Sequence, residues 1–132
     1  MLVSIEKQND GTYIAYNKDG EGFTAIGTGD TIKDAREDFF NSIEEVKESY
    51  KDRGINAPAA LMETPTFKFD LASFFEYYSF INATAFARKI GINDSLMRQY
   101  KQGKTYISEL QLQRIQTAIN SIGADFQSLR LV

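Results

Sequence analysis

The stretch that decides the fold is NATAFARKIGINDSLMRQYKQG, which runs from Asn82 to Gly103. It predicts two short helices, 83–90 and 94–102, because each begins after an asparagine that can cap it and ends at a glycine that can adopt a left-handed backbone. A small residue, Ala87, stands where two crossed helices must touch, and apolar residues stand at the offsets that hold the crossing: Phe86, Ile90, Ile92, Met97 and Tyr100. The spacing is typical of a DNA-binding helix-turn-helix, with an ordinary helical hairpin as the alternative.

Basic side chains surround this stretch. Between Phe86 and Arg114 the chain has six Lys or Arg residues and two acidic ones. A basic face can neutralise phosphates, and polar side chains on a helix in the major groove can read base edges. Asp94 is unusual here, and it either stabilises its own helix or accepts a hydrogen bond from a cytosine amino group. The predicted DNA-binding residues are Asn93, Asp94, Ser95, Arg98, Gln99, Lys101, Lys104, Tyr106 and Arg88.

A last helix is predicted from the capping box of Ser108 and Gln111, and Gly123 is predicted to end it. The residues after it, 126–132, alternate and predict a terminal strand. A single helix-turn-helix contacts few base pairs, so we expect a homodimer or a higher even oligomer. The spare apolar surface for this pairing is the terminal strand, together with residues 66–70.

The first half of the chain has strand patterns followed by one long helix. Strands are predicted at 2–8, 12–16 and 23–27, with turns at Asn9-Asp10-Gly11 and at 18–22 between them. Thr31 can cap a helix whose apolar residues recur every three or four positions, at Ile32, Ala35, Phe39, Ile43, Val46 and Tyr50. The opposite face is acidic, and its predicted role is binding a basic partner through Glu37, Glu44, Glu45 and Glu48.

Proline and glycine mark a linker at 52–65, in which 59–62 could form a short fourth strand. Residues 66–70 predict another strand, and Asp70 can cap the helix that follows it. The predicted fold class is α+β, with a β-β-β-α-β domain at 1–65 and a helical DNA-binding and dimerisation domain at 66–132 that ends in a strand.

The composition narrows the function. The 132 residues contain neither Cys nor His, which removes disulfides, thiolate nucleophiles and His-dependent catalysis. We therefore expect a protein that is not an enzyme and uses neither a metal nor another cofactor. No run is apolar enough for a membrane span, so a cytoplasmic protein is expected. Residues 1–66 have seven basic and thirteen acidic side chains, whereas residues 67–132 have eight basic and five acidic ones. This asymmetry indicates a basic partner for the first half of the chain and a polyanion for the second half.

A carboxylate nuclease is the remaining catalytic alternative. Asp10, Asp19, Glu21 and Asp30 lie near predicted strand ends, and two Mg²⁺ ions would need such acids clustered. Turn motifs already account for most of them. The sequence therefore favours a binding protein over a nuclease.

Two family resemblances join these observations. Residues 83–108 resemble the Cro/cI-like repressors, and the matching positions at and after the end of the second helix are Gln102, Gly103, Lys104, Tyr106 and Ser108. Residues 10–16, 22–31 and 34–35 resemble the HicB antitoxins, although no Pro-Asp-Leu-Pro precedes Gly22 and Phe23 stands where Cys is frequent. The resemblance implies a partial ribonuclease-H-like front domain that sequesters a HicA-type toxin, a small basic ribonuclease, and a rear domain that represses the operon. A stand-alone repressor with a sensing or dimerising front domain is the alternative.

Overall fold

The computed structural model describes residues 1–18 and 20–132, and its architecture is α+β. The chain divides into two compact units, Met1–Ser79 and Phe80–Val132. None of the helices in the described part of the chain is long and apolar enough to cross a membrane. In chain order the elements are β1 (Leu2–Lys7), β2 (Tyr13–Asn17), β3 (Ile26–Gly29), α1 (Ile32–Asp52), the 3₁₀ helix η1 (Ala59–Met62), β4 (Thr66–Phe69), α2 (Leu71–Tyr77), α3 (Ala83–Ile90), α4 (Asp94–Gln102) and α5 (Glu109–Ser128).

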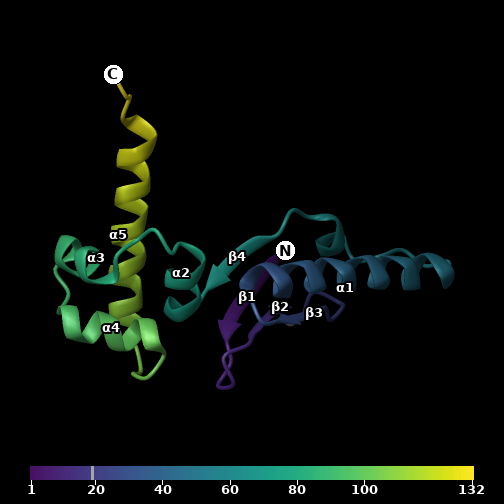
Figure 1. Ribbon diagram of the computed structural model, residues 1–132. Helices are drawn as coiled ribbons and strands as arrows, with labels where there is room; N and C mark the ends of the chain where they lie inside the picture. Colours follow the sequence, from purple (N-terminus) through teal and green to yellow (C-terminus); the bar gives the residue numbers. More distant parts are fainter. Residues whose placement is uncertain (19) are drawn as a thin grey trace. The chain divides into compact units, whose positions relative to one another are not determined.

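The first unit contains a mixed sheet with the strand order β3-β2-β1-β4 (Figure 1). The pairs β1–β2 and β2–β3 are antiparallel, as the predicted turns require. In contrast, β4 runs parallel to β1, with Leu2 opposite Thr66 and Ile5 opposite Phe69. A parallel pair needs a long crossover, and the segment containing α1 provides it while α1 covers one face of the sheet.

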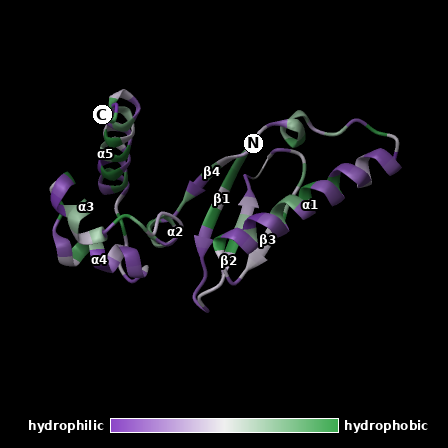
Figure 2. Cartoon of the chain, turned by 45° about the horizontal axis from the view of Figure 1, so that its top comes forward, coloured by the Kyte–Doolittle hydropathy of each residue, from purple (hydrophilic) through white to green (hydrophobic). Residues whose placement is uncertain are grey.

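The core of this unit lies between the sheet and α1. Alternate residues of β1, Val3 and Ile5, are fully buried, and so is Phe39 of α1. In Figure 2 β1 is green over much of its length, whereas α1 carries much purple. Thr31 caps α1 as predicted, because its hydroxyl accepts a hydrogen bond from the Asp34 N–H at 3.1 Å. All six predicted apolar positions of this helix are buried or half-buried.

Two glycines in β3 allow α1 to lie directly against the strand. A Cβ at Gly27 would stand 2.1 Å from the backbone nitrogen of Phe39 and 2.3 Å from the carbonyl oxygen of Ala35. At Gly29 a Cβ would stand 2.7 Å from the backbone nitrogen of Ala35. Since real carbon atoms do not approach backbone so closely, any side chain at Gly27 would force the helix away from the sheet.

The predicted boundary between residues 65 and 66 is corrected to 79/80. The strand predicted at 66–70 forms, but it joins the front sheet because its backbone pairs with β1. The short strand considered at 59–62 is instead η1, whose Leu61 is buried. Pro58 precedes η1, and the Leu61 N–H donates to the Pro58 carbonyl, which favours a tight turn over an extended strand.

The predicted terminal strand is also wrong. Helix α5 continues through Gly123 to Ser128, and 129–132 form neither helix nor strand. One glycine inside a helix costs only about 1 kcal/mol, so it does not end a helix whose apolar residues keep a helical spacing on both sides. The third strand begins at Ile26 rather than at residue 23. The turn predicted at 18–22 includes Asp19, which lies outside the described residues.

Candidate nucleic-acid interface

Helices α3 and α4 have the predicted ends at both termini. The Asn82 side chain accepts from the Ala85 N–H at 2.9 Å, and Asn93 accepts from the Leu96 N–H at 3.1 Å. Gly91 and Gly103 close the two helices with φ of 76° and 71°. Only Gly91-Ile92-Asn93 joins the helices, so the caps fix where each begins and ends and the connection is short.

The inner side of this helix pair is apolar, as predicted. Ala87 and Met97 are fully buried, and Phe86, Ile92 and Tyr100 are buried as well. Ile90 is only half-buried. The small side chain of Ala87 allows a close approach of α3 and α4, which are in contact with one another.

The outer side of α4 carries a polar row that faces solvent. Ser95, Arg98 and Gln99 are exposed, and Gln102 continues the same row one turn further on. Gln102 is not among the residues predicted to bind DNA, although its spacing of seven residues from Ser95 places it on the same helix face. The side chains of this row offer hydrogen-bond donors and acceptors that can pair with those on the edges of bases.

Two members of this row already have partners within the unit. The Thr105 hydroxyl donates to Gln99 Oε1 at 2.7 Å, and one Arg98 nitrogen lies 3.4 Å from the Thr84 hydroxyl. The second contact is long and therefore weak. Gln99 is held in place, while Arg98 is exposed and has four further N–H donors.

Asp94 forms an ion pair with Arg88. Its Oδ2 atom accepts from Arg88 Nε at 2.9 Å and lies 2.8 Å from a terminal guanidinium nitrogen. The pair connects α3 with the first turn of α4. The capping role belongs to Asn93, so Asp94 has a further role that the sequence reasoning did not include: it neutralises the charge of Arg88.

The last turn of α4 and the loop after it present their cations to solvent. Lys101 and Lys104 are exposed, and the Tyr106 side chain is 86% exposed. The Lys104 N–H donates to the Gln99 carbonyl, which attaches the loop to the end of α4. The Ser108 hydroxyl then accepts from the Gln111 N–H at 3.2 Å and caps α5, as predicted.

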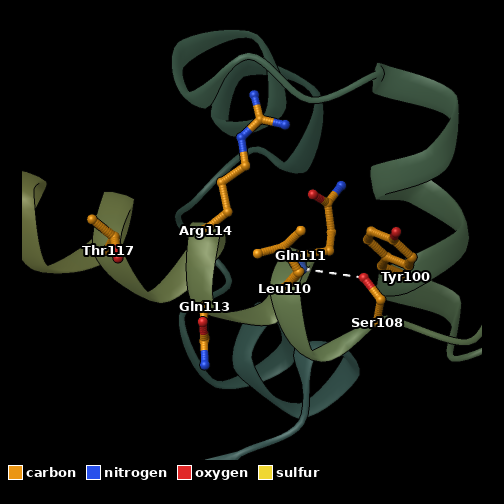
Figure 3. Close-up of a pocket in the computed structure, with 7 residues that line it drawn as sticks. All are labelled: Tyr100, Ser108, Leu110, Gln111, Gln113, Arg114 and Thr117. Atoms are coloured by element: carbon orange, nitrogen blue, oxygen red, sulfur yellow. Dashed lines mark hydrogen bonds between the residues drawn. The ribbon is translucent and has the colours of Figure 1, made fainter.

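Arg114 fixes the turn between the two helices from α5. One of its terminal nitrogens donates to the Gly91 carbonyl at 2.9 Å. The same side chain borders an open hollow of about 580 Å³ whose other lining residues are Tyr100, Ser108, Leu110, Gln111, Gln113 and Thr117 (Figure 3). Arg114 is the only charged residue in this lining, and its guanidinium already donates to the Gly91 carbonyl, so we interpret Arg114 as a structural residue.

Comparison with known proteins adds no relative to this picture. The chain matches no protein-family model, no curated protein and no solved structure. The functional argument therefore rests on the residues of the chain itself.

The acidic residues predicted to bind a partner lie on the exposed side of α1. Glu37, Glu44, Glu45 and Glu48 are all exposed. They do not form a purely negative surface, because Lys47 lies 3.2 Å from Glu44 in an ion pair. The face combines both signs, with an excess of acids.

Two of the carboxylates near strand ends, Asp10 and Glu21, have hydrogen-bond partners within the first unit. Asp10 accepts from both the hydroxyl and the N–H of Thr12, and these hydrogen bonds lower the pKa of the Asp10 carboxyl. Glu21 accepts from the Asn17 side chain at 3.2 Å. Among residues 1–18 and 20–132, no three acidic side chains converge as a metal site would require, and Asp19 lies outside that range.

Proposed function

We propose that this protein is the antitoxin of a type II toxin–antitoxin system. Its first unit binds and neutralises a HicA-type toxin that cleaves mRNA, and its second unit binds operator DNA as a homodimer or a higher even oligomer and represses the operon. In this proposal it acts in the cytoplasm, without a cofactor and without catalysis of its own.

The observation that carries the proposal is the capped pair α3–α4 with its exposed polar row. The row lies on the opposite side of α4 from the buried Met97 and Tyr100, which is the arrangement a recognition helix needs. Residues 80–132 contain seven Lys or Arg against three Asp or Glu, so the unit attracts a polyanion. These properties support a helix-turn-helix with α4 as the recognition helix.

The antitoxin part of the proposal draws support from the first unit. Its elements follow the order β-β-β-α-β that the resemblance to the HicB antitoxins implies, with η1 between the helix and the last strand. Residues 1–79 have eight basic and fifteen acidic side chains, which suits a basic ribonuclease as partner.

DNA binding is tested by fluorescence anisotropy with operator and scrambled duplexes over a salt series. We expect Arg98→Ala to cost about 1–3 kcal/mol on the operator and to relax discrimination at one base step. Lys104→Ala should weaken both duplexes equally and lower the salt slope by about one unit per subunit. An equal loss on both duplexes for Arg98→Ala would make Arg98 a phosphate contact and leave base reading to Ser95, Gln99 or Gln102.

A stand-alone repressor is the second candidate, and the mixed charge of the α1 face favours it. Co-expression separates the two functions. We expect a small basic open reading frame beside the gene to be toxic alone and harmless together with the full chain. Toxicity that the full chain does not relieve would exclude the antitoxin function and leave the repressor.

A further inference from the structure

Helix α5 carries an apolar row that is largely exposed. Leu112, Ile115, Ile119, Ile122 and Phe126 follow one another on α5 at steps of three, four, three and four residues, and Leu129 stands three residues further on, directly after the end of the helix. Ile115 is buried, whereas Ile119 and Ile122 are only half-buried, Phe126 is 66% exposed and Leu129 is 47% exposed. We call the last four residues the α5 row. Its spacing is that of the seam along which two helices pack.

The surroundings of the α5 row are almost uncharged. Between residues 115 and 129 the only charged side chain is Asp125, whereas the 21 residues of α1 include eleven. A helix that stays in water normally carries charge on its outer positions, as α1 does. Loss of charge around an exposed aromatic and aliphatic row is instead characteristic of the centre of a protein–protein interface.

We propose that the α5 row pairs with the same row of a second copy of this chain. A two-fold interface brings a surface against itself, so like charges on that surface would face one another. Ile119, Ile122 and Phe126 follow one another on α5 at steps of three and four residues, and Leu129 stands directly after the end of the helix. With one charge nearby, two copies meet almost without repulsion.

Gly123 lies beside the α5 row, one helical turn after Ile119. A Cβ at this position would meet nothing within 4 Å, so the protomer does not require a glycine there. Absence of a side chain lets another backbone approach closely. In Figure 1 the C-terminal turns of α5 extend past α3 and α4.

This inference deepens the proposed function, since it names the surface that would bring two recognition helices together. The pairing itself does not depend on DNA binding, and the inference rests on the proposed function only in the purpose it gives to the dimer. It also replaces the predicted pairing through a terminal strand, because that segment is helical as far as Ser128.

The test is sedimentation equilibrium of the full chain without DNA or toxin, so failure of the inference and failure of the proposed function remain distinguishable. We expect the native chain to be dimeric at micromolar concentration. Phe126→Ser should weaken dimerisation about 100-fold, because two-fold symmetry removes the phenyl group on both sides of the interface. Since Phe126 is mostly exposed in the protomer, far-UV circular dichroism should stay unchanged.

Leu110→Ser is the matched control. Leu110 is 79% exposed on the same helix but lies outside the α5 row, so its replacement should leave the dimer intact. A monomeric native chain would overturn the inference. So would a Phe126→Ser variant as dimeric as the native chain, or a Leu110→Ser variant as monomeric as Phe126→Ser.

Discussion

Replacing Asp94 by Asn should strengthen the binding of any DNA duplex. In the native chain the Asp94 carboxylate neutralises the guanidinium of Arg88. Removal of the acid leaves Arg88 free to contact a phosphate and also removes a negative charge from the proposed interface. The variant keeps the size of the side chain, and Asn93 still caps α4.

The size of the effect follows from counterion release. One additional cation per protomer steepens the dependence of log affinity on log salt by about 0.9, which corresponds to about 3.5-fold in affinity between 50 and 200 mM salt. The cost to folding is small: the Arg88 side chain is 73% exposed, and exposed ion pairs contribute about 0–1 kcal/mol. Loss of the acid from the first turn of α4 adds about 0.3–1 kcal/mol.

A charge cycle measured by anisotropy on operator and scrambled duplexes isolates this effect. Asp94→Asn should bind both duplexes more tightly at low salt, Arg88→Gln should bind both more weakly, and the double variant should return to the native salt slope. An unchanged slope in Asp94→Asn would place Arg88 away from the DNA and refute the reasoning. Tighter binding of the scrambled duplex with weaker binding of the operator would instead assign Asp94 to a cytosine.

Three further outcomes are expected. Gly27→Ala should lower the free energy of unfolding of the first unit by about 3 kcal/mol or more, because the added Cβ would overlap the backbone of α1. Amide hydrogens of residues 32–52 should then exchange faster with solvent, whereas those of residues 83–102 should not. Reversing the charges of Glu44, Glu45 and Glu48 to Lys should slow toxin association about tenfold at low salt, measured by stopped flow; an effect that persists at high salt would contradict an electrostatic cause. Burial, with smaller contributions from Glu76 and Asp70, raises the pKa of the Tyr13 hydroxyl above its usual 10.0. Because the folded state favours the neutral phenol, the free energy of unfolding should be unaffected below about pH 10 and should decrease above it. Tyr13→Phe should reduce that decrease in unfolding curves measured at alkaline pH.

The features predicted well from sequence are those fixed by local chemistry. The bounds of α3 and α4 agree with the prediction residue for residue, because Asn82, Gly91, Asn93 and Gly103 each act on the turn in which they stand. The caps at Thr31, Asp70 and Ser108 formed for the same reason. Short-range hydrogen bonds leave the chain little choice of conformation.

The features missed depend on distant parts of the chain. Nothing within residues 66–69 says that their backbone pairs with β1 rather than with another element. The Asp94–Arg88 ion pair joins two helices and depends on their crossing geometry, which the sequence does not give, although both residues are among those predicted to bind DNA. The predicted end of α5 at Gly123 is wrong because the apolar spacing continues beyond this glycine and outweighs its local effect.

The parallel pairing of β1 with β4 has a consequence for synthesis of the protein. Strand β1 is interior to the sheet, yet its two neighbours are made at very different times, since Leu2 pairs with Thr66. At about 5–20 residues per second, β1 waits roughly 3–13 s for its second partner. During that interval the edge of a strand containing two core residues, Val3 and Ile5, has no backbone partner on one side. The nascent chain thus passes through an aggregation-prone stage that the finished unit no longer has.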